Sequence, residues 1–198
     1  LIDLKGLRRI ARRRRGEFLI AMITMIVVFS VNITAGIVAA IALSLLEVIA
    51  RQYNAPAYVL GLAAKGYDYK PAVPGAQTQP GLIVYRFDST VFFANATGFA
   101  DRLRALVDGA PDPVSWVIID CADITDVDYS AGETLDRLVV ALHAKGVHVV
   151  LARPEPRLLR TLDQYELTRL LDPAHIYSDL DIAIAAFAET TRRPAPGK

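Results

Sequence analysis

An almost uninterrupted apolar run over residues 18–50 constrains this chain most. A dense basic segment precedes the run, and residues 81–190, which are patterned as an α/β domain, follow it. A membrane-spanning helix needs roughly 20 apolar residues, so the run is long enough to enter a bilayer. This order predicts a membrane protein that carries a folded domain on one side of the bilayer.

The composition adds two constraints. The net charge of +1 and the charged fraction of 22% are ordinary, whereas the apolar fraction of 53% is somewhat high, and its excess lies in residues 18–50. The single cysteine, Cys121, excludes an internal disulfide and suits a reducing compartment. Residues 81–190 suffice for one hydrophobic core. Because the chain starts with Leu and not Met, we expect further sequence upstream.

The apolar run has two interpretations. It is either one long, tilted helix or two short helices that meet near Asn32, where the sequence is more polar. The positive-inside rule places the preceding arginines in the cytoplasm, and two crossings would return the domain to that side. We favour two helices because the lone cysteine suits the cytoplasm. We assign residues 1–16 to a basic cytoplasmic juxtamembrane segment and residues 17–50 to the membrane segment.

The basic segment has other interpretations. A signal peptide would have a shorter apolar region of about 7–15 residues, so this alternative is disfavoured. A nucleic-acid-binding patch is also disfavoured, since arginines beside a membrane segment usually lie on acidic lipid headgroups. We therefore expect membrane lipid and no nucleic acid among the partners. The segment carries seven basic residues, Lys5, Arg8, Arg9, Arg12, Arg13, Arg14 and Arg15.

Residues 51–80 lack a sustained period and are rich in Pro and Gly, which predicts a linker. Residues 81–190 form the folded domain, and residues 191–198 are expected to be a disordered tail.

Strands and helices alternate in the domain, which predicts a mostly parallel or mixed β-sheet flanked by helices. The first two strands should be antiparallel because the turn at residues 88–90 is too short for a crossover. Ser178 with Asp181 resembles a capping box for the last helix. Strands are expected at 82–87, 91–94, 116–119, 147–152 and 176–177, helices at 95–107 and 130–145, from Pro156, and from about 180, and a helical turn at 166–171.

The loop from Asp120 to Glu133 follows a core strand and leads into a helix, which is where sites lie in open α/β sheets. Ser130, expected to be exposed at the helix N-terminus, is the best candidate for a phosphorylated or ligand-contacting residue. An ordinary capping box formed by Ser130 and Glu133 is the stronger interpretation of the spacing alone.

Other residues give no sign of catalysis. Asp120, Asp123, Asp126 and Asp128 do not have the spacing of a Ca²⁺ loop, and capping and turns account for them better. We expect Cys121 to be a small buried apolar residue. The histidines have no zinc-like spacing and are expected at the surface or at an edge. We predict no enzyme, no metal and no cofactor. The histidines are His143, His148 and His175.

Two segments resemble a known family. Residues 81–88, GLIVYRFD, with residues 91–96, VFFANA, and a helix that contains Phe99 and Arg102, resemble the start of the STAS domain of SulP-type sulfate permeases. Residues 128–132 resemble its second landmark, the loop before the next helix. The two apolar halves, with Gly36 and Ala40, are similar to the last two membrane helices of such transporters. The first segment contains the signature residues Arg86, Asp88, Phe93 and Asn95, and the loop comprises Asp128, Tyr129, Ser130, Ala131 and Gly132.

The resemblance implies a STAS fold, a mixed sheet of four or five strands with helices around it. It also implies a cytoplasmic regulatory and assembly domain attached to an upstream transport domain of the same polypeptide, in a homodimeric transporter of sulfate or a related anion. Transport would be coupled to protons or sodium, or would proceed by exchange. Since the substrate site of the family lies upstream, this chain alone should transport nothing.

The resemblance extends to single residues in the loop. Ser130 aligns with the serine that related anti-sigma factor antagonists phosphorylate, and Asp128 with the loop aspartate. Tyr129 and Ala131 depart from the pattern, and the bulk of Tyr129 is expected to hinder a kinase. Guanine nucleotide binding is known in the family, although no residue here can be assigned to it. The alternative function is a membrane-tethered STAS signalling protein of the anti-sigma factor antagonist type, with a regulatory protein as its partner.

Overall fold

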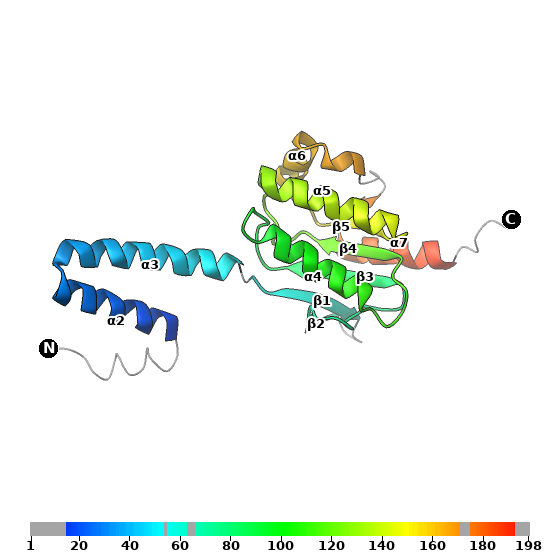
Figure 1. The fold of residues 1–198 in the computed structure, drawn as a ribbon. Helices are drawn as coiled ribbons and strands as arrows, with labels where there is room; N and C mark the ends of the chain where they lie inside the picture. Colours follow the sequence, from blue (N-terminus) through cyan, green and yellow to red (C-terminus); the bar gives the residue numbers. More distant parts are fainter. Residues whose placement is uncertain (1–14, 54, 63–65, 171–174, 193–198) are drawn as a thin grey trace. The chain divides into compact units, whose positions relative to one another are not determined.

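A computed structural model describes residues 15–53, 55–62, 66–170 and 175–192. The chain divides into two compact units, Leu1–Asn54 and Ala55–Lys198 (Figure 1). Most of the predicted basic segment 1–16 and of the predicted tail 191–198 lies outside the described residues. Helix α7 extends to Arg192, slightly beyond the predicted end of the domain.

The first unit is a helical hairpin. Helix α2 spans Arg15–Ser30, helix α3 spans Ile33–Tyr53, and the chain reverses between them (Figure 1). The side-chain oxygen of Asn32 accepts a hydrogen bond of 2.8 Å from the backbone N–H of Ala35 and so caps α3. The prediction of two apolar helices that meet near Asn32 is therefore confirmed.

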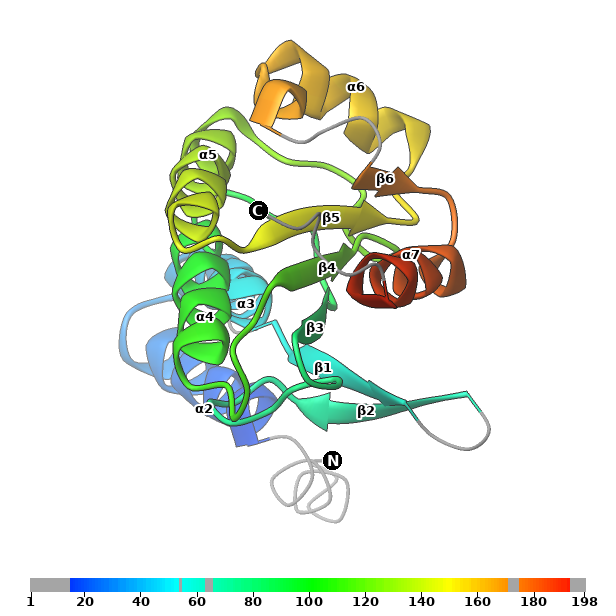
Figure 2. The ribbon, with the colours of Figure 1, turned by 90° about the vertical axis from the view of Figure 1, so that its right-hand side faces the viewer.

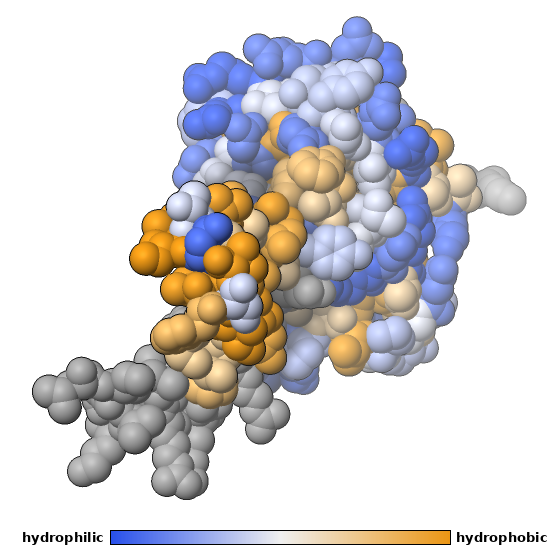
Figure 3. All heavy atoms as spheres, turned by 60° about the vertical axis from the view of Figure 1, so that its left-hand side comes forward, coloured by the Kyte–Doolittle hydropathy of each residue, from blue (hydrophilic) through white to orange (hydrophobic). Residues whose placement is uncertain are grey.

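The hairpin presents its apolar side chains outward (Figure 3). The segment Ile33–Ala50 is long and apolar enough to cross a membrane, and only 6% of it is buried, whereas the apolar part of α2, Phe18–Ser30, is shorter. Phe29 is 85% exposed. Exposed apolar surface on this scale is unfavourable in water and favourable in lipid.

The two helices pack closely at Gly36. A Cβ atom at this position would lie 2.0 Å from a methyl carbon of Val28 on α2, so only glycine fits without a shift of the helices. Small residues that let helix backbones approach are the usual basis of helix packing in membranes.

The second unit is a six-stranded mixed sheet in the order β2-β1-β3-β4-β5-β6. Strand β1 pairs antiparallel with β2 and β3, while β3, β4, β5 and β6 pair in parallel. The strands are β1 (Ala57–Leu62), β2 (Tyr67–Pro71), β3 (Leu82–Phe87), β4 (Trp116–Asp120), β5 (His148–Ala152) and β6 (Ile176–Tyr177).

Helices cover both faces of the sheet (Figure 2). One face packs against α4 and α5 and, near the β6 edge, against α6 and a short 3₁₀ helix, η1. The other face packs against α7 through Leu180, Ala183 and Phe187. Alternate residues of β3 enter the two cores, Ile83 and Tyr85 on one face and Leu82 and Val84 on the other. The helices are α4 (Ala96–Asp108), α5 (Tyr129–Ala144), α6 (Pro156–Gln164), η1 (Leu167–Leu170) and α7 (Leu180–Arg192).

The predicted mixed sheet flanked by helices is confirmed, although it has six strands and not four or five. The predicted strand at residues 91–94 is wrong. Val91 forms only an isolated bridge with Val127, and β3 takes its antiparallel partner from β1. Asn95 prevents a continuous strand because its side-chain oxygen binds the N–H of Phe92 and folds the segment into a turn.

The predicted linker 51–80 contains β1 and β2, so it is not merely a connector. Its Pro and Gly residues lie where a sheet tolerates them. Pro56 precedes β1, Pro71 ends the edge strand β2, and Gly66 takes a positive φ of 84° directly before β2. The tyrosine hydroxyl of Tyr67 also donates a hydrogen bond to Asp181 of α7, which ties β2 to the far helix.

The capping box predicted for α7 is also wrong. The side chain of Asp179, and not that of Ser178, accepts the hydrogen bond from the backbone N–H of Asp181, at 2.8 Å.

A fragment that starts at Ala55 should be more stable than one that starts at Gly81. Without β1 and β2 the edge of β3 is unpaired and the buried side chains of Val59 and Leu60 no longer cover the cores. Urea denaturation and NMR spectra of the two fragments test this expectation. Equal stability of the two fragments would show that β1 and β2 do not stabilise the domain.

Replacing Gly36 by Ala should lower the melting temperature of the protein in detergent by several degrees, because the added methyl group meets Val28. A second change, Val28→Ala, should restore part of the loss. Gly98→Ala is the matched control, since its Cβ has no neighbour within 4 Å. Equal effects of Gly36→Ala and Gly98→Ala would contradict the close packing of α2 and α3.

Candidate functional site

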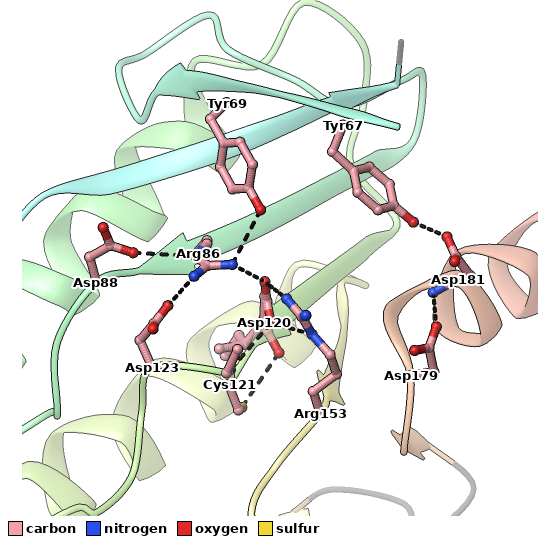
Figure 4. Close-up of polar contacts among 12 residues, drawn as sticks. Tyr67, Tyr69, Arg86, Asp88, Asp120, Cys121, Asp123, Arg153, Asp179 and Asp181 are labelled. Carbon is pink, nitrogen blue, oxygen red and sulfur yellow. Dashed lines mark hydrogen bonds and ion pairs between the residues drawn. The ribbon is translucent and has the colours of Figure 1, made fainter. Parts of the chain in front are cut away.

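The carboxyl ends of β3, β4 and β5 lie next to one another because the three strands are parallel. We call this end of the strands the carboxyl edge of the sheet. Arg86 near the end of β3, Asp120 at the end of β4 and Arg153 directly after β5 converge there (Figure 4). In open α/β sheets this edge is the usual place for a site.

Asp120 is the centre of the convergence. Its carboxylate is fully buried and accepts two hydrogen bonds from the Arg153 guanidinium, at 3.1 Å from Nε to Oδ1 and 2.6 Å from Nη2 to Oδ2. Arg86 Nη1 lies 3.5 Å from Oδ2 of the same carboxylate. A buried carboxylate is costly unless it is paired and hydrogen-bonded, and here two cations satisfy it.

Arg86 links this pair to the neighbouring loops. Its Nη2 lies 2.5 Å from Oδ2 of Asp123 and its Nε lies 3.2 Å from Oδ1 of Asp88. The guanidinium also donates to the Tyr69 hydroxyl at 3.2 Å, with the Tyr69 ring centroid 5.4 Å away (Figure 4). Partial burial works to lower the pKa of Arg86, but the carboxylates around it outweigh burial and raise the pKa.

Arg153 reaches Asp120 from an unusual backbone conformation. Its φ of 56° lies in the left-handed region, which residues other than Gly rarely adopt. The hydrogen bonds to Asp120 hold it there and raise the pKa of Arg153. Arg86 lies near the end of the strand predicted at 82–87 and Arg153 directly follows the strand predicted at 147–152, and these positions were the signal in the sequence for this contact.

The four loop aspartates have different roles. Asp126 accepts hydrogen bonds from the N–H of Val127 and from Arg157, and Asp128 caps α5, which agrees with the predicted capping and turn roles. Asp120 and Asp123 instead form ion pairs with the arginines. Within the described ranges, no group of three or more His, Cys, Asp or Glu side chains is placed to hold a metal ion.

Asn95 holds the loop at residues 90–95, in the first segment with signature residues, through hydrogen bonds of its buried side chain. It is buried, its side-chain oxygen accepts from the N–H of Phe92 at 2.9 Å, and its amide donates to the carbonyl of Thr90 at 2.9 Å. Phe93, in contrast, is 70% exposed. The loop is therefore rigid in its backbone and presents an aromatic ring to the outside.

Asp128 joins the two signature segments. One carboxylate oxygen accepts from the N–H of Ala131 at 2.8 Å and caps α5, and the other accepts from the N–H of Phe93 at 2.9 Å. The bridge between Val91 and Val127 lies beside this contact. The structure thus brings together the two segments that the sequence placed 35 residues apart.

Ser130 does not cap α5, so the capping-box interpretation is wrong. Asp128 takes that role, and the Ser130 side chain is exposed in the first turn of the helix. Tyr129 is 64% exposed and packs edge-to-face on Tyr165, with ring centroids 5.7 Å apart. Ala131 is fully buried. A Cβ at Gly132 would lie 3.1 Å from the Tyr165 ring, which explains the small residue there.

Cys121 is buried, and burial raises the pKa of its thiol, so it has the apolar environment that we predicted. The histidines lie nearer one another than the sequence indicated. His148 and His175 flank Trp116, with their own ring centroids 5.8 Å apart. Burial, together with these two histidines, lowers the pKa of His143.

The edge combines a neutralised ionic cluster with exposed groups. The carboxylates of Asp120 and Asp123 balance the charges of Arg86 and Arg153, and the ion pairs hold the ends of three strands together. The exposed side chains of Phe93, Tyr129 and Ser130 form the accessible part. Exposed rings on rigid loops suit recognition of another surface better than chemical catalysis.

Asp120→Asn should lower the free energy of unfolding of a fragment starting at Ala55 by about 3 kcal/mol, because it removes a buried charge shared by two cations. Asp101→Asn, which breaks an exposed pair with Arg104, is the matched control and should cost less than about 0.5 kcal/mol. Urea denaturation followed by Trp116 fluorescence measures both. Similar losses in the two variants would contradict a structural role for the cluster.

Comparisons with known proteins agree with this architecture. Residues 74–183 match the STAS domain family. The chain is 35% identical over 189 residues, 94% of its length, to a protein of Mycobacterium tuberculosis named as a probable sulfate transporter, and it spans 34% of that relative. The chain therefore corresponds to about a third of the length of this curated relative.

Solved structures share the fold. The murine Solute Carrier 26 family member A9 anion transporter, in the inward-facing state, has a TM-score of 0.79 at 18% identity, over 96% of this chain and 31% of that one. The crystal structure of a sulfate transporter family protein from Wolinella succinogenes has a TM-score of 0.51 at 19% identity, over 61% of this chain and 98% of that one. These findings confirm the resemblance predicted from residues 81–96 and 128–132, and the chain belongs to the STAS domain family.

Proposed function

We propose that this chain is part of a secondary active transporter of sulfate or a related anion, in which the STAS domain regulates transport and supports assembly. The observation that carries the proposal is the similarity, across 94% of the chain, to a protein named as a probable sulfate transporter, and this similarity includes both the apolar hairpin and the domain. A STAS domain by itself would be compatible with several functions. Similarity that extends over the hairpin as well as the domain supports a transporter.

The hairpin supports a cytoplasmic position for the domain. Helices α2 and α3 run in opposite directions (Figure 1). A hairpin inserted from one side returns the chain to that side, and the basic residues before α2 favour the cytoplasm. The chain would therefore lie in the inner or cell membrane with the STAS domain inside the cell.

The chain spans only 34% of its relative, and we propose that the rest of the polypeptide contains the transport domain. In this proposal the intact protein is a homodimer, and the STAS domain receives a regulatory signal at the loop formed by residues 128–132. Ser130 supports this role because its side chain is exposed at the N-terminus of α5, where a phosphoryl group is electrostatically favoured. A regulatory protein or a nucleotide could supply the signal.

The intact polypeptide, reconstituted in lipid vesicles, should take up radiolabelled sulfate. The fragment that comprises residues 1–198 should give no uptake above that of empty vesicles. If the intact polypeptide moves neither sulfate nor another inorganic anion under proton, sodium or exchange gradients, the proposed activity is wrong.

Ser130→Glu in the intact protein should change the uptake rate severalfold without affecting folding, since the side chain is exposed and does not cap α5. Thr125→Glu, an exposed position in the preceding loop, is the control for an added charge. Uptake rates and circular dichroism spectra are compared with those of the wild type. Unchanged uptake in Ser130→Glu would exclude a regulatory role for this residue.

A further inference from the structure

A small cavity lies inside the domain, in the core between the sheet and the helices α4, α5 and α6. Its volume is about 50 Å³. Fourteen apolar residues line it, and all of them except the half-buried Leu135 are buried. Ile119 of β4 and Val149 of β5 line it from the sheet, and Leu138 of α5 and Leu158 of α6 line it from the helices, which cover this face (Figure 2). The cavity therefore belongs to the core of the domain.

Short side chains make up part of the wall of this cavity. Cys121, Val127, Val139 and Val149 are among the lining residues, and each is shorter than the leucines that line the rest of it. Helix α6 has only nine residues and buries two of them, both leucines. Because protein cores are close-packed and have few voids larger than a water molecule, the cavity is a distinct feature of this core.

The cavity has room for water but offers it too few hydrogen-bond partners. A water needs roughly 10–15 Å³ and about two to four polar partners. The thiol of Cys121 is the only polar side-chain group among the lining residues, and it donates to the carbonyl of Ile119 at 3.5 Å. The buried polar side-chain atoms that lack a partner in the described part of the chain all belong to residues that do not line the cavity. We therefore expect the cavity to be dry.

We propose that this cavity binds one small apolar molecule, of the size of a xenon atom, a diatomic gas or a two-carbon hydrocarbon. A dry apolar cavity of roughly 150 Å³ binds benzene or xenon. The cavity in this domain has about a third of that volume, so a benzene ring is too large for it. A bound molecule restores the dispersion contacts that side chains around an empty space lack. The site is independent of the proposed transport activity.

A molecule in the cavity contacts the inner side of the loop between β4 and α5. Ile124 and Val127 of this loop line the cavity, and Val127 forms its isolated bridge with Val91, which lines the cavity too. A ligand that binds the folded state and not the unfolded chain stabilises the fold. Occupation of the cavity therefore stabilises the packing beneath the loop that leads to Asp128 and α5.

Methyl NMR spectra of the chain of residues 1–198 in lipid nanodiscs, recorded under increasing xenon pressure, test the proposal. The methyl signals of Leu138 and Val149 should shift and reach saturation, with shifts severalfold larger than those of Val84 and Val150 in the core on the other face of the sheet. Benzene should leave the signals of Leu138 and Val149 in place. Shifts that are absent, that are equal on the two faces or that benzene reproduces would overturn the proposal.

A substitution that fills the cavity gives a second measurement. Val149→Ile adds one methyl group at the cavity wall, so it should raise the melting temperature by about 2–4 °C and reduce the xenon-induced shift of Leu138 severalfold. Val150→Ile is the matched control. Val150 is the next residue of β5, is fully buried in the other core and does not line the cavity, so the same added group should lower the melting temperature. Equal destabilisation by the two substitutions, or an undiminished xenon response in Val149→Ile, would contradict the site.

Discussion

Parallel pairing of β3, β4 and β5 is the constraint on which the rest of the domain depends. Parallel strands cannot be joined by tight turns, so each connection crosses the sheet as a helix and each strand ends at the same edge. This brings Arg86, Asp120 and Arg153 within bonding distance although they are far apart in the chain. The buried carboxylate of Asp120 in turn requires both arginines. The alignment of the strands therefore places the ion pairs, and the ion pairs stabilise that alignment.

At the carboxyl ends of these strands, different residues stabilise the fold and form the exposed surface. Asp120 at the centre of the ionic cluster is buried and paired with two arginines, whereas Phe93 on its loop and Tyr129 and Ser130 in the first turn of α5 are exposed. Hydrogen bonds from the side chains of Asp128 and Asn95 hold these segments. Rigid loops at the ends of parallel strands are a general way to present a surface without loss of stability.

Much of the fold followed from local pattern. The long helices, the buried strands and the break near Asn32 came from periodicity and polarity, which are strong signals in long segments. The errors were in short segments. Residues 57–62 and 67–71 were missed as strands because the Pro and Gly residues in and around them resemble those of a linker. Residues 91–94 were wrongly predicted as a strand because four consecutive apolar residues do not distinguish a strand from a turn.

The sequence by itself determined the apolar hairpin, the alternation of strands and helices, and the two signature segments, because each depends on residues close together in the chain. Only the tertiary structure decided that Asp128 and not Ser130 caps α5, that β1 and β2 complete the sheet, and that Asp120 is shared by two arginines. Apart from the short-range pairing of β1 with β2, these features depend on contacts between residues more than 25 positions apart or on competition between neighbouring side chains. A local sequence pattern cannot predict such contacts or the outcome of such competition, because the interactions that decide them form only in the folded chain.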